Sequence, residues 1–348
     1  VIACRGEKIF SAASTELSVA ITATATMSGS GTIVVDSVAG FATSGTLQLD
    51  SEKFTYTGVD AASTPNEFTG VTRATESTTA AAHISRVTVS SPWTEIDTGR
   101  TNASKYRFER FNYDGNEKII FVDGVNAPVV FNLALSATDV STAAVVGSKF
   151  VVSFKSHMFY AGKSTTPELL NFSEGFNEDG FSAGVADPAG SIRVDDTITG
   201  IKVFRDSLFI FCENRIFKLT GSVASDFAIV PVTRSIGCIN GDTIQEFGGD
   251  LVFLGPDGLR TVAATAKIGD TELGTISKSV QSIFDKNIKD SALFESVVIP
   301  DKTQYRIFFT KDDEADSITR GITCVMRQDR FEFSEVRGIK PSCTDTFV

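Results

Sequence analysis

Two stretches near the middle of the chain decide its fold: Leu208-Phe-Ile-Phe-Cys-Glu-Asn-Arg-Ile-Phe-Lys-Leu219 and Asp250-Leu-Val-Phe-Leu-Gly-Pro-Asp-Gly-Leu-Arg-Thr-Val262. Each stretch contains two short apolar strands separated by a tight polar turn. The two copies lie about 43 residues apart, and weaker copies follow on both sides. Recurrence of a strand set at this spacing is typical of the blades of a β-propeller.

The turns between these strands support the prediction of hairpins. Gly255-Pro-Asp-Gly258 places Pro where φ near −65° is wanted and Gly where φ can be positive. The pairs Glu213-Asn214 and Asp123-Gly124 fit tight two-residue turns. A polar pair, Lys155-Ser156, joins two further apolar strands.

Strand sets of this kind recur from about residue 90 onward. We distinguish five of them: Tyr106–Phe131, Phe150–Ala161, Ile201–Leu219, Thr243–Val262 and Phe294–Phe333. The chain contains 28 Phe and 5 Tyr, so most aromatic rings carry no polar group and are suited to the core between sheets. We therefore predict an all-β fold in which residues 90–348 form the blades of a β-propeller.

The first part of the chain has a different character. Residues 1–28 contain an alternating stretch, Leu17–Met27, which predicts a strand leading into the propeller. The sequence Ser28-Gly-Ser-Gly31 is interpreted as a flexible joint. Residues 29–89 are rich in Thr and Ala and poor in Phe. We expect them to form a separate small β module inserted into the larger fold.

One helix is predicted, between the fourth and fifth strand sets. In Ile276–Ile288, five apolar residues recur at helical spacing and fall on one face: Ile276, Val280, Ile283, Phe284 and Ile288. We expect this face to pack on the rim of the propeller. The alternative is that it contacts a neighbouring subunit.

Charge and cysteine content exclude several classes of function. The formal net charge is −11, and no run of Lys or Arg occurs, so tight binding to a phosphate backbone is not expected. The five Cys are scattered without a CxxC motif, which indicates neither a zinc site nor a disulfide framework. No apolar run reaches membrane-spanning length, so this chain is not expected to insert into a membrane.

Catalytic motifs are also missing from the sequence. There is no GxSxG, P-loop or GxGxxG, and two His, His83 and His157, cannot form a three-His zinc site. Carboxylates that could serve a glycosidase are Asp195, Asp196, Asp242, Glu246 and the Asp312–Asp316 cluster. Adjacent carboxylates on a strand point to opposite faces, and acidic loop clusters are usually solvated. We predict a non-enzyme with no catalytic residue, cofactor or metal.

A resemblance to a known family adds to this interpretation. The stretches Ile198–Gly221 and Gly237–Arg260, followed by the predicted helix, resemble the tail nozzle proteins of short-tailed bacteriophages, also called tail tubular protein B or tail stabilisation proteins. The resemblance covers most of residues 100–345. The segment Thr32–Val89 is similar to β modules of phage tail proteins.

The resemblance implies a structural virion protein that is assembled in the host cytoplasm and located in the tail. It implies a homo-oligomer, expected to be a hexameric ring, which contacts the tail adaptor ring and the tail fibres. DNA would pass through the lumen during ejection without specific binding. As a lumen or inter-subunit loop we select the charged segment between two apolar strands that contains Lys311, Asp312, Asp313, Glu314 and Asp316.

Two other functions remain open. The chain could be a fibre-attachment or host-recognition tail protein, or it could be a propeller glycosidase with convergent carboxylates at the mouth of the central channel. The sequence begins without Met and ends in Thr346-Phe-Val348, so we expect it to be part of a longer polypeptide.

Overall fold

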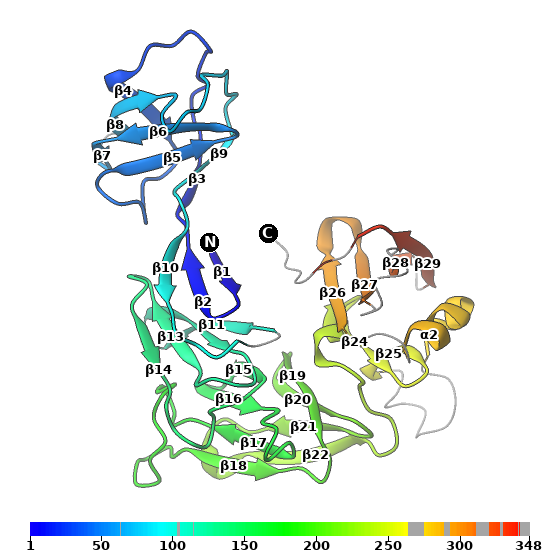
Figure 1. Ribbon diagram of the computed structural model, residues 1–348. Helices are drawn as coiled ribbons and strands as arrows, with labels where there is room; N and C mark the ends of the chain where they lie inside the picture. The colour runs from blue at the N-terminus through cyan, green and yellow to red at the C-terminus, as the bar shows by residue number, and fades with distance from the viewer. Residues whose placement is uncertain are drawn as a thin grey trace. The chain divides into compact units, whose positions relative to one another are not determined.

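The computed structural model describes residues 1–62, 64–102, 105–113, 115–263, 275–288, 293–310, 320–327, 330–339 and 341 (Figure 1). The chain divides into two compact units, Val1–Asn102 and Ala103–Val348, here called unit 1 and unit 2. In both units, the paired strands run antiparallel.

Among the described residues of unit 2, five sheets follow one another along the chain. Blade 1 contains β11 (Arg107–Tyr113), β12 (Asn116–Val122), β13 (Val129–Asn132) and β14 (Ala137–Asp139). Blade 2 contains β15 (Phe150–Phe154), β16 (His157–Ala161), β17 (Leu169–Phe172) and β18 (Gly190–Arg193). Blade 3 contains β19 (Ile198–Phe204), β20 (Ser207–Cys212), β21 (Ile216–Thr220) and β22 (Ala228–Thr233), with the 3-10 turn η1 (Ala224–Asp226) before β22.

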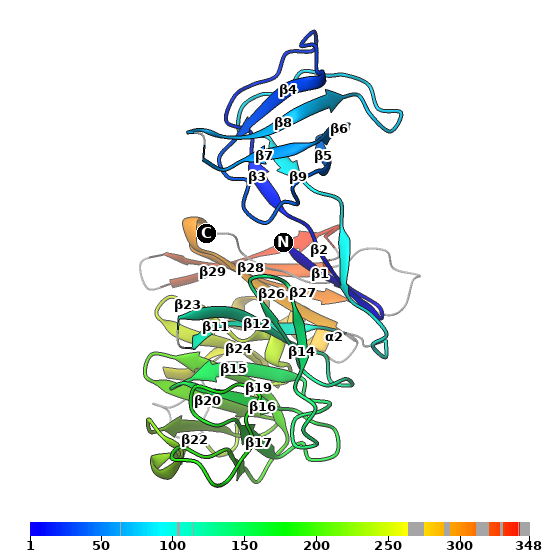
Figure 2. The ribbon, with the colours of Figure 1, turned by 90° about the vertical axis from the view of Figure 1, so that its left-hand side faces the viewer.

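The last two blades complete this set. Blade 4 begins with the 3-10 turn η2 (Gly241–Thr243) and contains β23 (Gln245–Phe247), β24 (Asp250–Gly255) and β25 (Gly258–Thr261). Blade 5 contains β26 (Leu293–Ile299), β27 (Gln304–Thr310), β28 (Arg320–Arg327) and β29 (Arg330–Arg337), with η4 (Pro300–Lys302) between β26 and β27. Each blade pairs its strands in chain order, so every blade is a simple meander (Figure 2).

In blades 2, 3 and 4, the middle strands are apolar on both faces because each of these blades packs between two others. On β20, Leu208, Ile210 and Cys212 join a core cluster with blade 2. The alternate residues Phe209 and Phe211 join a second cluster with blade 4. Side chains alternate across a strand, so a strand covered on both faces must be apolar at every position. This is the physical reason for the continuous apolar stretch at Leu208–Cys212.

Face-to-face packing of successive meanders, four of them four-stranded and blade 4 three-stranded among the described residues, defines the architecture as a β-propeller. The predicted fold class is confirmed, and the five predicted strand sets fall on blades 1 to 5. The first strands of the blades lie next to one another at a common cavity. Figure 1 shows the sheets in chain order, from β11 in teal through β19 in green to β26 in orange.

Two of the predicted turns form as expected, and one does not. Gly255 pairs with Gly258 across a Pro256-Asp257 turn, with Gly258 at φ +128°. Glu213-Asn214 lies inside the hydrogen bond from the Cys212 N–H to the Arg215 carbonyl. The prediction for Asp123-Gly124 is wrong, since β12 ends at Val122 and β13 starts at Val129. There, the Asp123 carboxylate accepts hydrogen bonds from the backbone of Val125 and Asn126 and builds a longer turn.

The predicted helix is present but shorter. It starts with the 3-10 turn η3 (Lys278–Val280) and continues as α2 (Gln281–Ile288). Phe284 is fully buried. All five predicted apolar residues pack against a core cluster formed by blades 4 and 5. The apolar face of the helix is thus used for packing within unit 2.

Unit 1 contains two sheets. The smaller sheet consists of β1 (Ile2–Arg5), β2 (Lys8–Ser11) and β10 (Thr94–Asp97). The larger sheet consists of β3 (Ser14–Glu16), β4 (Ser28–Val35), β5 (Gly45–Leu49), β6 (Glu52–Tyr56), β7 (Gly58–Asp60), β8 (Asn66–Arg73) and β9 (Thr88–Ser90). The larger sheet is inserted between β2 and β10, whose residues Ser11 and Thr94 are paired partners.

The observed boundaries differ from the expected divisions at 28/29 and 89/90. Leu17 and Ile21 belong to the buried core of the larger sheet, so the module begins at β3 and not after residue 28. Residues 90–102 belong to unit 1 rather than to the propeller blades. The expected strand at Leu17–Met27 is reduced to single bridges, Leu17 to Val35 and Ile21 to His83.

The interpretation of Ser28–Gly31 as a flexible joint is wrong. These residues begin β4 and pair with β8 through a β-bulge between Ser28 and Gly31. Gly29 has φ +82°, and a Cβ on Gly31 would lie 2.7 Å from Met27 Cγ. Gly29 therefore allows the positive φ of the bulge, and Gly31 leaves room for the Met27 side chain.

Candidate functional site in the propeller channel

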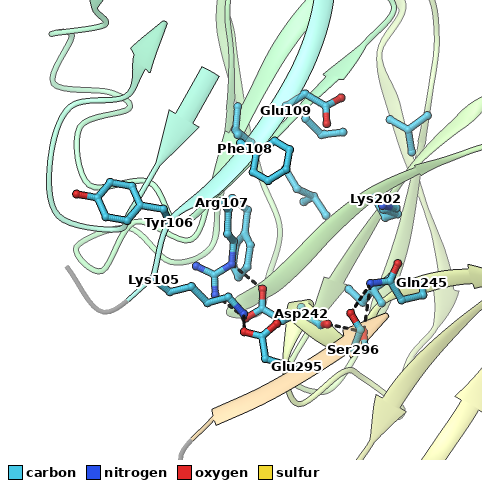
Figure 3. Close-up of a pocket in the computed structure, with 17 residues that line it drawn as sticks. Lys105, Tyr106, Arg107, Phe108, Glu109, Lys202, Asp242, Gln245, Glu295 and Ser296 are labelled. Carbon is cyan, nitrogen blue, oxygen red and sulfur yellow. Dashed lines mark hydrogen bonds and ion pairs between the residues drawn. The ribbon is translucent and has the colours of Figure 1, made fainter. Parts of the chain in front are cut away.

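The first strands of the five described blades surround a cavity of about 360 Å³, here called the channel (Figure 3). Its walls are formed by Lys105–Glu109, Phe150–Val152, Ile201–Val203, residues 241, 242, 244 and 245, and Glu295–Ser296. Among the described lining residues, three cations, Lys105, Arg107 and Lys202, face three anions, Glu109, Asp242 and Glu295. The channel is thus polar but charge-balanced.

Four of these charged groups form one connected cluster. Arg107 Nε and Nη2 donate to Asp242 Oδ1 and Oδ2 at 2.7 and 2.8 Å, a bidentate ion pair. Lys105 Nζ lies 2.9 Å from Asp242 Oδ2 and also pairs with Glu295 Oε1. Figure 3 shows the side chains of Lys105, Arg107, Asp242 and Glu295 directed toward one another. The cluster joins the start of blade 1 to blades 4 and 5.

Local structure holds each member in place. The Arg107 guanidinium lies 4.9 Å from the centre of the Phe150 ring, a cation–π contact. Asp242 lies in η2, where the Asn240 side chain accepts from the Asp242 N–H at 2.8 Å. Ser296 Oγ donates to the Asp242 carbonyl at 2.6 Å. These contacts fix the two ends of the bidentate pair.

The carboxylates of the channel differ in acidity. Burial opposes ionisation of Asp242, but hydrogen bonds and charges from Arg107 and Lys105 outweigh it and lower the pKa of Asp242. Burial raises the pKa of Glu295, and its ion pair with Lys105 offsets this only in part. Burial also raises the pKa of Glu109, whose carboxylate accepts from the Ser153 N–H at 3.1 Å.

The carboxylates of this cluster are engaged in ion pairs, which bears on the chemistry they can do. Two carboxylates in one cavity whose pKa values are shifted in opposite directions form the pattern of an acid–base pair. Here, however, both oxygens of Asp242 are held by Arg107, and Lys105 contacts both Asp242 and Glu295. A nucleophile or base whose oxygens are already paired is poorly placed to attack a substrate. In the described ranges, no group of three His, Cys, Asp or Glu side chains is arranged to hold a metal ion.

Sequence reasoning identified one member of this cluster. Asp242 was a candidate carboxylate, and it lies in the channel. Asp196 does not; its carboxylate accepts from the backbone of Thr197 and Asn214 in a turn. Lys105, Arg107 and Glu295 were missed. For Glu295 the available signal was a charged residue on the otherwise apolar strand β26.

The predicted loop residues Lys311, Asp312, Asp313, Glu314 and Asp316 lie outside the described residues. Described neighbours on either side are Thr310 of β27 and Arg320 of β28. The prediction for this loop therefore stays a prediction.

Both histidines are buried and hydrogen-bonded. In unit 1, His83 Nδ1 and Nε2 lie 2.9 Å from Asp50 Oδ2 and from Glu52 Oε2. Glu52 is fully buried, and Arg73 donates to its two oxygens at 2.9 and 2.8 Å. Burial works against ionisation of Glu52, but the Arg73 hydrogen bonds and further donors lower its pKa to about 2. This buried cluster is a structural tie within the module.

His157 in blade 2 is fully buried. Its Nδ1 lies 2.6 Å from the Ser173 carbonyl and its Nε2 lies 3.0 Å from Asp187 Oδ2. Since both partners are acceptors, both hydrogen bonds form together only when both ring nitrogens carry a proton. His157 thus ties β16 to the loop that follows β17.

Comparison with known proteins gives similar solved structures but no matching family. No family model matches the chain, and no curated protein matches it. Among solved structures, the N-terminal domain of Nup159 is similar with 11% identity and a TM-score of 0.40, over 67% of this chain and 62% of that one. Hsv2 from Kluyveromyces lactis is similar with 9% identity and a TM-score of 0.36, over 94% of this chain and 100% of that one.

The phage phi92 endosialidase is similar with 14% identity and a TM-score of 0.30, over 64% of this chain and 43% of that one. At such scores these likenesses carry no argument about function. The class of the protein, a β-propeller, follows from the five sheets and their packing. Within the described part of the chain, no helix is long and apolar enough to cross a membrane.

Proposed function

We propose that this propeller is a structural subunit of a bacteriophage tail, which assembles into a ring-shaped nozzle through which DNA leaves the virion. The observation that carries the proposal is the channel cluster, in which Arg107 and Lys105 hold Asp242 and Glu295. These ion pairs stiffen the contact between blades and engage the carboxylates of Asp242 and Glu295. A rigid wall needs such stiffness and no active site.

The charge of the chain supports the same function. A net charge of −11 disfavours binding of nucleic acid, because phosphates are repelled by an acidic surface. A channel through which DNA leaves the virion must not bind that DNA tightly. The partners in this proposal are other copies of the chain in a hexameric ring, a tail adaptor ring and tail fibres, and the site of action is the virion tail.

The proposal is tested by the assembly state of the purified chain. We expect mass photometry and negative-stain electron microscopy to show closed rings of six subunits at micromolar concentration. A monomer at all concentrations, or a three-fold spike, would contradict the nozzle. A three-fold spike would instead favour a fibre-attachment or host-recognition protein.

The opposed pKa shifts of Asp242 and Glu295 favour a propeller glycosidase as the second candidate. It is tested by incubating the chain with capsular and lipopolysaccharide glycans and measuring released reducing ends. We expect no turnover. Hydrolysis that Asp242→Asn and Glu295→Gln abolish, while Asp196→Asn retains it, would replace the structural proposal by the enzymatic one.

A further inference from the structure

A second cavity, of about 250 Å³, lies between blade 1 and the loop that follows β17. We call it the loop pocket. Blade 1 contributes Lys118, Val130, Asn132, Ser136 and Thr138, and the loop contributes Phe176, Asn177, Glu178 and Asp179. It shares no lining residue with the channel. Its size is just under the range of about 300–1,000 Å³ that holds drug-sized ligands, so it suits a single small ring.

Phe176 presents an aromatic ring to solvent beside this pocket. Its relative exposure is 58%, and its φ of +59° is in the left-handed region that disfavours a residue with a side chain. The Phe176 N–H donates to the Ser156 carbonyl at 2.7 Å, and its ring meets the Tyr113 ring edge-on at 6.4 Å. A left-handed backbone that holds an apolar ring at the edge of a cavity is the kind of local strain that occurs at ligand sites.

The interior of the pocket offers both hydrogen-bond donors and acceptors. Glu178 is 6% exposed, and its Oε1 pairs with Lys118 Nζ. Glu178 Oε2 accepts no hydrogen bond from the described residues. Asn132 Oδ1 accepts from the Ser136 N–H at 3.0 Å, which leaves its amide group as a donor. A buried carboxylate, an ammonium and an amide therefore lie within one small cavity.

The loop is held in shape before any ligand binds. The buried His157 binds the Ser173 carbonyl and Asp187. Glu174 Oε1 accepts from the Ser182 N–H at 2.6 Å, the hydrogen bond that contributes most to its lowered pKa. The Tyr160 hydroxyl donates to the Glu178 carbonyl at 2.7 Å. Such preorganisation reduces the entropy that a ligand must otherwise supply on binding.

We propose that the loop pocket binds one neutral pyranose ring of a saccharide. The Phe176 ring covers the C–H face of the sugar, and adjacent hydroxyls donate to Glu178 and accept from Lys118 and the Asn132 amide. Lys118 and Glu178 neutralise one another, and Asp179 adds one further carboxylate that can accept from a sugar hydroxyl. A hydroxyl that both donates and accepts matches this mixed lining better than a purely anionic or cationic group.

The test uses the full chain and saturation-transfer NMR with the methyl glycosides of glucose, galactose, mannose and N-acetylglucosamine. We expect at least one to receive saturation, with the ring C–H protons receiving most of it. Phe176→Ala is expected to weaken binding at least about tenfold, and Phe176→Trp to keep it within about threefold. The matched control is Trp93→Ala, which removes another exposed aromatic ring, in unit 1, and leaves affinity unchanged.

A second variant keeps the proposal testable if Phe176→Ala perturbs the loop. Asn132→Ala removes a donor from blade 1 and is expected to weaken the same glycoside at least about threefold, with an unchanged melting temperature. No transfer to any glycoside overturns the proposal. So does a glycoside affinity that Phe176→Ala and Asn132→Ala both leave unchanged. These outcomes do not depend on ring assembly, so they are separate from the nozzle proposal.

Discussion

At the scale of single residues, buried or largely buried charged groups such as Glu52 and Asp242 are paired with cations. The buried Glu52 of unit 1 accepts two hydrogen bonds from Arg73, and it also accepts from the Ala74 and Ala81 N–H groups. An isolated buried carboxylate is costly, and a full set of donors makes it tolerable. Removal of one partner therefore leaves a buried carboxylate without the donors of that partner, which lowers the stability of the fold.

Arg73→Met is expected to destabilise unit 1 by about 3 kcal/mol, because Glu52 keeps its burial and loses its bidentate partner. The measurement is urea unfolding of residues 1–102 followed by circular dichroism. Lys53→Met is the matched control, since Lys53 and Glu76 form an exposed ion pair that is expected to contribute little to stability. Equal losses in the two variants would contradict the role of burial.

The same residue predicts a pH dependence. The pKa of Glu52 is lowered from 4.5 to about 2 in the fold. Its contribution to stability is therefore fully present above pH 4.5 and is lost as the pH falls toward 2. Unfolding measured between pH 6 and pH 2 should show this loss in the wild type and a smaller loss in Glu52→Gln. A loss of the same size in both would assign the dependence to other carboxylates.

Replacement of Arg107 tests the role of a largely buried ion pair in unit 2. Arg107→Met is expected to cost about 2 kcal/mol, because Asp242 stays largely buried with Lys105 as its remaining cation. Arg110→Met on the same strand is the control, since Arg110 and Glu117 are both exposed. Scanning calorimetry of the full chain should show a lower melting temperature for Arg107→Met alone. An unchanged melting temperature would remove the support for a stiffening role.

At the scale of elements, one hairpin turn has backbone angles that its residue types disfavour. Lys155 and Ser156 join β15 to β16 with φ values of +47° and +63°. Such two-residue turns favour Asn-Gly because both residues need positive φ. The polar pair predicted a turn, but a Lys-Ser sequence does not reveal its left-handed conformation.

Replacing Lys155-Ser156 by Asn-Gly is therefore expected to stabilise unit 2 by about 1 kcal/mol. The measurement is thermal unfolding of the full chain. The converse control is Gly249→Ala in the β23–β24 turn, at φ +76°, where an added Cβ meets nothing within 4 Å. That change isolates backbone strain and should destabilise by about 1 kcal/mol. Stabilisation by Gly249→Ala would invalidate the strain argument.

At the scale of the whole molecule, the two units have separate cores. The module core contains Leu17, Phe54 and Phe68, and it includes no residue of unit 2. The module also enters and leaves its host sheet at paired positions, Ser11 and Thr94. An insertion with adjacent ends and its own core is removable without changing the rest of the fold.

Replacement of residues 14–91 by two glycines is therefore expected to leave the blades intact. Hydrogen exchange of peptides from β15 to β22 should match that of the full chain, because their core clusters lie wholly in unit 2. Faster exchange in these strands would show that the blades depend on the module. Ring assembly of this variant, measured by mass photometry, would then report whether the module is needed for oligomer formation.

The sequence by itself determined the propeller class, the five strand sets and the small β module, because each depends on local patterns. Continuous apolar strands such as Leu208–Cys212 identify sheets buried on both faces, and helical spacing identified α2. The sequence also placed Asp242 among the candidate carboxylates. It did not reveal the bulge at Ser28–Gly31, because glycine-rich sequence is compatible with both a joint and a bulge.

Only the tertiary structure decided the sites. Arg107 and Asp242 are 135 residues apart, and Lys105 and Glu295 are 190 residues apart, so no local pattern pairs them. The loop pocket likewise joins Lys118 to Glu178 from different blades. The physical reason is that strand formation depends on neighbours one and two positions away, whereas a site depends on which strand ends the closed packing of blades brings together.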